Sequence, residues 1–193
     1  MNIIHKSAAG IDLVPMEANM LSHRKVFVEG EITSDTAQEF MKKIMYLNSE
    51  GDAPISVYIN SPGGEVTAGL QMYDVIVGSN ATIKTFCTGR AYSMAAILFA
   101  CAKERYMLPN SELMLHEPLV GGRIGGNASS IKSTSDSLLE TKAKLNRIIA
   151  DITGKSEQEI NEATRFDHYF DATEAVSFGL CDEIVSFAEI LRK

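Results

Sequence analysis

The sequence predicts an α/β fold, arranged as one domain over residues 1–193. Short apolar segments with strand character occur at residues 25–28, 55–60 and 82–87. Between them, residues 34–47 and 65–77 carry apolar side chains at helical spacing. Such alternation favours parallel strands covered by helices, with functional residues on the loops that leave the strand ends.

The second half of the chain continues this rhythm. A helix of almost purely apolar residues is expected to begin at Ser93, and a long helix is expected over residues 127–153 with Gly154 as its stop. Two capping boxes, Ser156 with Glu159 and Asp171 with Glu174, predict two further short helices. The remaining strands are expected near residues 105–108, 113–116 and 181–187.

The long helix has an unusual apolar face. Four aliphatic residues follow one another at intervals of seven positions: Ile131, Leu138, Leu145 and Ile152. Ile148 lies between the last two. A narrow seam of this kind can pack against another helix, as in a contact between subunits. An ordinary amphipathic helix lying on its own domain would show a similar pattern, and the sequence leaves both interpretations open.

Composition excludes several classes of function. The formal charge is −7 and Lys and Arg form no run, so the chain offers no basic surface for nucleic acid. The longest apolar stretch, at residues 94–102, is too short to span a membrane, and the N-terminus lacks the apolar run of a secretion signal. We therefore expect a cytoplasmic protein. Its three widely spaced cysteines suit buried, reduced thiols and predict neither disulfide nor metal site.

Two segments at predicted strand ends could carry chemistry. The sequence Ser-Pro-Gly-Gly at residues 61–64 can expose backbone N–H groups to an anion, although a simple Pro-Gly turn is the commoner role. No phosphate-binding loop pattern is present. Ser93 stands where a strand gives way to an apolar helix, and it either caps that helix or presents a nucleophilic hydroxyl.

A serine nucleophile needs a base and an orienting carboxylate. Among four histidines, His116 is the best placed, because it ends an apolar strand and begins a loop. Asp171 is explained as a helix cap, whereas Asp167 lies between aromatic residues with no evident local role. The sequence therefore favours Ser93, His116 and Asp167 as partners.

These motifs, in this order, resemble the Clp protease proteolytic subunit (ClpP) family over about residues 26–184. The segments that carry the resemblance are Tyr-Ile-Asn-Ser-Pro-Gly-Gly at 58–64, Ser93-Met94, His116-x-Pro118, Asp167, Ala-Thr-Glu-Ala at 172–175 and Gly179-Leu180. The resemblance implies a crotonase-like fold of repeated ββα units, with a protruding handle helix in a segment of about 119–153.

The resemblance also implies a function and the roles of individual residues. It implies an ATP-independent serine endopeptidase that needs no cofactor, built as a homo-oligomer of two stacked seven-membered rings. Ser93 would be the nucleophile, His116 the general base and Asp167 its orienting partner, with the N–H groups of Gly64 and Met94 as oxyanion hole. The substrate would be a peptide, or an unfolded polypeptide delivered by an AAA+ unfoldase.

The glycine-rich segment at residues 121–126 stands where the family has the strand and loop leading into the handle. Its backbone would let a substrate peptide lie alongside as an added strand, although a hinge is the plainer interpretation. The residues expected to bind substrate there are Gly121, Gly122, Arg123 and Ile124.

The chain departs from the family pattern at three places. Residues 11–24 match the family's N-terminal stretch poorly. Tyr92 replaces the small residue that usually precedes the nucleophile, and Ala95 replaces a glycine. We expect these two replacements to narrow the substrate pocket.

Three alternatives remain at this point. The first is a paralogous or phage-type head-maturation peptidase of the same fold. The second is a crotonase-like acyl-CoA enzyme, which would have no reason to keep Ser93, His116 and Asp167 together. The third is a catalytically idle subunit of a mixed ring, against which the presence of all three residues argues.

Overall fold

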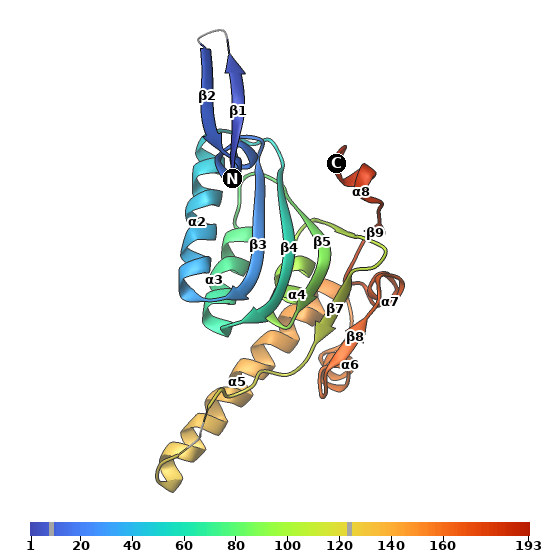
Figure 1. Cartoon of the computed structure of the whole chain (residues 1–193). Coiled ribbons are helices and arrows are strands. Elements are labelled where there is room, and N and C mark those ends of the chain that lie inside the picture. Colours follow the sequence, from blue (N-terminus) through green and yellow to red (C-terminus); the bar gives the residue numbers. More distant parts are fainter. Residues whose placement is uncertain (8–9, 123–124) are drawn as a thin grey trace.

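The computed structural model describes residues 1–7, 10–122 and 125–193 (Figure 1). Strands and helices alternate along most of the chain. The strands are β1 (Asn2–Ser7), β2 (Gly10–Pro15), β3 (Lys25–Ile32), β4 (Ile55–Gly64), β5 (Ile83–Tyr92), β6 (Glu104–Met107), β7 (Glu112–Leu115), β8 (His168–Phe170) and β9 (Glu183–Ile184). The helices are α1 (Met16–Ser22), α2 (Ser34–Ser49), α3 (Val66–Val77), α4 (Met94–Ala100), α5 (Ala128–Thr153), α6 (Glu157–Ala163), α7 (Ala172–Phe178) and α8 (Phe187–Ile190).

The central sheet is mostly parallel, which confirms the α/β prediction. Strands β3, β4, β5, β6 and β9 lie in that order with parallel pairing. Strand β7 pairs in parallel with the far end of β5, and the short strand β8 pairs antiparallel with β7. The ends of β5, β7 and β8 therefore meet at one corner of the sheet (Figure 1).

The two faces of the sheet are covered differently. Helices α2, α3 and α4 pack on one face, and α4 is buried along its whole length. The other face carries a row of stacked aromatic rings, each on a neighbouring strand and in register: Phe27, Tyr58, Phe86 and Tyr106. The centroids of successive rings are 5.0 to 5.1 Å apart. This row orders the sheet across four strands.

Helix α5 is the predicted long helix, and it ends as expected at Gly154, which adopts a left-handed conformation. Its first half protrudes from the rest of the chain (Figure 1). The predicted seam is divided: Ile131 is 46% exposed, whereas Leu145 is 6% exposed and belongs to the chain's own core. At Leu145 the interpretation of the seam as a contact between subunits was therefore wrong, because the last turns of α5 pack on their own sheet and helices.

Several boundaries differ from the sequence prediction. Strand β4 does not end at Asn60 but continues with an irregular register through the Ser-Pro-Gly-Gly segment. The predicted last strand is reduced to Glu183–Ile184, and a capping box at Ser186 starts helix α8 instead. The hairpin of β1 and β2, helix α1 and strand β8 had no counterpart in the prediction. These are short elements that pair or pack without a long periodic signal.

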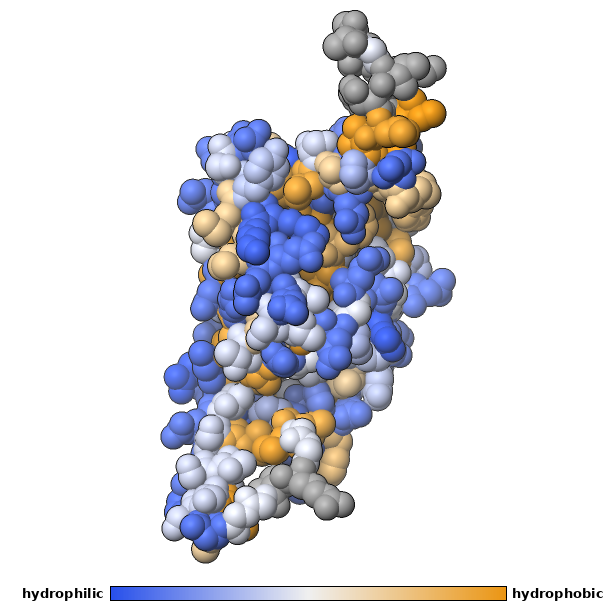
Figure 2. Space-filling model, turned by 60° about the vertical axis from the view of Figure 1, so that its left-hand side comes forward, coloured by the Kyte–Doolittle hydropathy of each residue, from blue (hydrophilic) through white to orange (hydrophobic). Residues whose placement is uncertain are grey.

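Exposed apolar surface gathers at two places on the face of the molecule drawn in Figure 2. Figure 2 shows it at the base of the N-terminal hairpin and again beside the protruding part of α5. Leu13 in β2 is 70% exposed, and Leu119, in the segment between β7 and α5, is 73% exposed. Both places lie away from the buried core, so these side chains are available for contacts beyond the chain.

Candidate active site

The end of β4 is held by a buried serine. The Ser61 hydroxyl donates a hydrogen bond to the Gly30 carbonyl at 2.6 Å and accepts one from the Gly63 N–H at 3.1 Å. A methyl group on Gly63 would lie 2.5 Å from the Tyr92 carbonyl oxygen and 2.9 Å from the Ser93 Cβ. The Ser-Pro-Gly-Gly backbone thus runs directly beside the Tyr92-Ser93 junction, an approach that only glycine permits.

Ser93 joins strand β5 to helix α4 in a strained conformation. Its φ is +54° and its ψ is −125°, a combination that residues with a side chain rarely adopt. Its hydroxyl makes no capping bond to the helix, so the capping interpretation was wrong. The Ser93 N–H donates to the Met114 carbonyl at 2.8 Å, which fixes the junction against β7.

The residue after β7 brings its imidazole to the serine. His116 Nε2 lies 2.8 Å from Ser93 Oγ, within hydrogen-bond distance. The same ring's Nδ1 lies 3.6 Å from Asp167 Oδ1. The His116 side chain is 16% exposed and the Asp167 side chain 57% exposed. The three residues predicted from the sequence therefore lie together, with the imidazole between the hydroxyl and the carboxylate.

Strand pairing explains how Asp167 reaches this corner. In the antiparallel pair of β7 and β8, Leu115 lies opposite His168, so the residues just beyond them, His116 and Asp167, are neighbours. Asp171, four residues later, is occupied elsewhere. Its carboxylate accepts hydrogen bonds from the N–H groups of Thr173 and Glu174 at 2.8 Å each, as the predicted cap of α7.

The two residues expected to form an oxyanion hole are Met94, which follows Ser93 in the chain, and Gly64, the last residue of β4. Met94 is the first residue of α4, a position whose N–H has no acceptor within the helix. Gly64 ends β4, where a methyl group would meet the Ile32 carbonyl oxygen at 2.1 Å. Gly64 directly follows Gly63, whose backbone runs beside the Tyr92-Ser93 junction, so both expected donors are next in the chain to residues of that junction.

Of the four residues expected to bind substrate, the structure describes two. Gly121 and Gly122 are exposed, and a methyl group on either would meet no atom within 4 Å. Arg123 and Ile124 lie outside the residues that the structure describes. The open space beside Gly121 and Gly122 leaves room for another backbone.

Three contacts around the site were not expected from the sequence. The Tyr92 hydroxyl lies 2.5 Å from Glu112 Oε1, and the Tyr92 ring meets the Tyr169 ring edge to face, with centroids 5.7 Å apart. The Lys142 ammonium of α5 pairs with the carboxylate of Glu117, the residue after His116, at 2.6 Å. No local pattern could have revealed any of these contacts, because each joins residues 20 or more positions apart.

The thiols are unsuited to catalysis. All three cysteines are free, as predicted, and burial raises the pKa of the Cys87 thiol to about 11 and that of Cys181 to about 11. Thiols with such pKa values stay protonated near neutral pH and are poor nucleophiles. Among the residues that the structure describes, no group of three His, Cys, Asp or Glu side chains could hold a metal ion.

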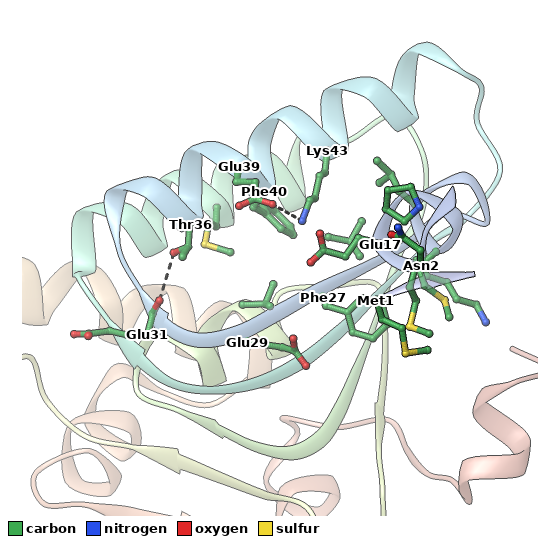
Figure 3. Close-up of a pocket in the computed structure, with 18 residues that line it drawn as sticks. Met1, Asn2, Glu17, Phe27, Glu29, Glu31, Thr36, Glu39, Phe40 and Lys43 are labelled. Atoms are coloured by element: carbon green, nitrogen blue, oxygen red, sulfur yellow. Dashed lines mark hydrogen bonds and ion pairs between the residues drawn. The ribbon is translucent and has the colours of Figure 1, made fainter. Parts of the chain in front are cut away.

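The pocket drawn in Figure 3 lies elsewhere. It is formed where the N-terminal hairpin and α1 meet β3 and α2, and Met1, Glu17, Phe27, Phe40 and Lys43 are among the residues that line it. Neither Ser93 nor His116 nor Asp167 lines this pocket. The candidate active site lies instead at the corner of the sheet where β5, β7 and β8 meet.

A strained serine at a strand-to-helix junction, hydrogen-bonded to an imidazole, is the arrangement of a hydrolase that uses a serine nucleophile. Comparison with known families agrees with this class. The family model described as Clp protease matches residues 10–187, and the chain belongs to that family. It is accordingly a peptidase of the serine type. Within the described part of the chain, no helix is both long and apolar enough to cross a membrane.

Proposed function

We propose that the chain is a serine endopeptidase subunit in which Ser93, His116 and Asp167 act as a catalytic triad. The observation that carries the proposal is the 2.8 Å contact between His116 Nε2 and Ser93 Oγ. It places the base within reach of the proton that must leave the hydroxyl. The strained Ser93 backbone adds support, since strain of this kind is typical of functional sites.

In the proposed reaction, Ser93 Oγ attacks the carbonyl carbon of a peptide bond while His116 Nε2 takes the hydroxyl proton. The N–H groups of Gly64 and Met94 hold the resulting oxyanion. His116 then gives its proton to the leaving amine, and the C–N bond breaks to leave an acyl-enzyme. A water molecule, deprotonated by His116, hydrolyses the ester and restores Ser93. Asp167 accepts a hydrogen bond from Nδ1–H and stabilises the imidazolium.

We also propose that the peptide lies along residues 121–124, as an added strand beside Gly121, Gly122, Arg123 and Ile124. Such binding uses backbone hydrogen bonds and depends little on the substrate's sequence. The open space next to Gly121 and Gly122 favours it. Peptides with a reduced or N-methylated backbone at the paired positions should bind measurably more weakly.

A fluorophosphonate probe tests the nucleophile directly. The wild-type chain should be labelled on Ser93, and Ser93→Ala should not be labelled. His116→Ala should also lose labelling, because the hydroxyl then has no base. Mass spectrometry that finds the label on Ser61 or another serine would contradict the assignment. A rise in melting temperature on adding coenzyme A would instead favour the acyl-CoA class.

The larger assembly is part of the proposal. We propose a compartment of two stacked seven-membered rings of this chain, fed by a separate AAA+ unfoldase. The protruding, partly apolar half of α5 supports a contact with a second ring. The protein alone should cut short peptides and spare a stably folded protein, which it should degrade only with an unfoldase and ATP. Rapid digestion of a folded protein without ATP would contradict the compartment.

A further inference from the structure

Asp167 receives little direct support from its surroundings. Its side chain is 57% exposed, and among the described residues its carboxylate makes an ion pair with His116 but no hydrogen bond. Its position must therefore come from the strand that follows it. That strand, β8, has three residues, pairs with β7 alone and exposes His168 and Tyr169. Short edge strands of this kind are held weakly by backbone pairing.

A row of side chains crosses the sheet next to the catalytic corner. Tyr92 of β5 lies opposite Met114 of β7, which lies opposite Tyr169 of β8. Side chains alternate between the faces of a sheet, so His116, two residues beyond Met114, and Asp167, two residues before Tyr169, belong to the same face. The Tyr92–Met114–Tyr169 row is thus the immediate neighbour of the His116–Asp167 pair.

The Tyr92 ring is anchored within this row. Its hydroxyl donates to the Glu112 carboxylate at 2.5 Å, and the Arg90 guanidinium lies 5.6 Å from its centroid. The hydrogen bond to Glu112, together with burial, raises the pKa of Tyr92 to about 12. The phenol therefore remains a hydrogen-bond donor over the pH range in which a histidine base can act.

The anchored ring meets β8 at one place. Its edge-to-face contact with Tyr169, at 5.7 Å between centroids and 90° between planes, is the geometry that aromatic pairs prefer. Tyr169 is two residues after Asp167. The Tyr92 side chain, which belongs to β5 and is bonded to β7, thus contacts β8, the strand that directly follows Asp167.

We propose that Tyr92 is a positioning residue for Asp167. The Tyr92 ring is held by Glu112 and packs against Tyr169, and this contact keeps the Asp167 carboxylate close to His116. The inference rests on the proposed triad. This role differs from the expectation that Tyr92 narrows the substrate pocket, since the Tyr92 hydroxyl bonds to Glu112 and the Tyr92 ring packs against Tyr169.

Steady-state kinetics on a short peptide separates the two roles. Tyr92→Ala and Tyr169→Ala should each lower kcat by about 10- to 100-fold with little change in KM, because a small misplacement of a catalytic group has effects of that size. The double variant should be no worse than either single variant, because both remove the same contact. Tyr92→Phe keeps the ring but loses the hydrogen bond that holds it, so kcat should fall by about threefold to tenfold, less than in Tyr92→Ala.

The pH profile gives a readout that a merely structural effect would not move. The groups around the His116 ring are the Ser93 hydroxyl, the Asp167 carboxylate and, next along the chain, Glu117, whose carboxylate is paired with Lys142. A displaced Asp167 stabilises the imidazolium less, so the acidic limb of kcat/KM should move to lower pH, by about one unit in Tyr92→Ala.

The matched control is Tyr46→Ala, since Tyr46 on α2 is 48% exposed, like Tyr169. It should leave kcat and the pH profile unchanged. A change in KM or residue preference in Tyr92→Ala, with kcat and the acidic limb as in wild type, would overturn the inference in favour of a pocket-narrowing role. Fluorophosphonate labelling of Ser93 in every variant keeps this outcome distinct from a failure of the proposed triad.

Discussion

The Nδ1 atom of His116 lies 3.6 Å from the Oδ1 atom of Asp167, a distance typical of an ion pair but beyond that of a hydrogen bond. Catalytic contacts of this kind are often long without substrate and shorten in the reacting complex. Solvent screens the half-exposed Asp167 carboxylate, so we expect its ion pair with His116 to contribute little to the stability of the fold. We expect the carboxylate to act by orienting the imidazole.

Asp167 and Asp171 should therefore respond differently to substitution. Asp167→Asn should lower kcat by about 10⁴-fold, as loss of the orienting carboxylate does in serine proteases, with little change in unfolding free energy. Asp171→Ala removes the cap of α7 and should cost about 1 kcal/mol of stability while kcat stays near wild type. Peptidase assays beside urea unfolding would decide, and the opposite pattern would mean that the two roles are exchanged.

The same corner shows what the sequence could and could not predict. Ser93 and His116 could be predicted because each stands at the end of a predicted element, and Asp167 because it lies between aromatic residues with no evident local role. All three also belong to motifs of the family. The continuation of β4 through Gly64 was missed, because Pro62 and two glycines indicate a turn. Ser61 stabilises the extended backbone instead, because its hydroxyl donates a hydrogen bond to the Gly30 carbonyl and accepts one from the Gly63 N–H. Gly30 is distant in the chain, and such a partner cannot be recognised from the local sequence.

Gly63 should be intolerant of any side chain. Gly63→Ala would bring a methyl group to 2.5 Å from the Tyr92 carbonyl oxygen, at a φ of +88° that alanine disfavours. The clash must displace the Ser93 junction, so kcat should fall about 100-fold or more, as for a misplaced catalytic group. Gly154→Ala is the matched control: it has a φ of +71° but open space around it, and should cost about 1 kcal/mol of stability without loss of kcat. Equal kinetic effects of the two substitutions would contradict this account of the site.

The pairing of Lys142 with Glu117 connects the handle helix to the segment that carries His116. The two charged groups are 2.6 Å apart, and their side chains are 23% and 39% exposed. Lys142→Glu should lower kcat several-fold, since a partly exposed pair contributes about 1 kcal/mol or less. The double variant Glu117→Lys with Lys142→Glu restores opposite charges and should recover most of the loss. A double variant as impaired as the single one would show that Lys142 acts in another way.

The handle helix provides the test of ring stacking, and the structure determines which residue to change. Leu145 is unsuitable, because it is 6% exposed and packs in the chain's own core, so that Leu145→Glu would bury an unpaired charge and prevent folding. Ile131 lies on the protruding half of α5 and is 46% exposed. Ile131→Glu should therefore leave the fold intact and act on assembly.

If two rings meet through this half of α5, symmetry repeats the contact in every subunit, and each buried aliphatic side chain contributes about 2 kcal/mol. Ile131→Glu should then give particles of about half the wild-type mass in light scattering, with an unchanged circular dichroism spectrum. Val77→Glu, which adds the same charge in place of a 57% exposed valine on α3, serves as the control and should keep the full mass. Peptidase activity of the Ile131→Glu particles should fall, because the ion pair between Lys142 and Glu117 links this helix to the segment that carries His116. An unchanged particle mass with full activity would mean that the exposed half of α5 does not join two rings.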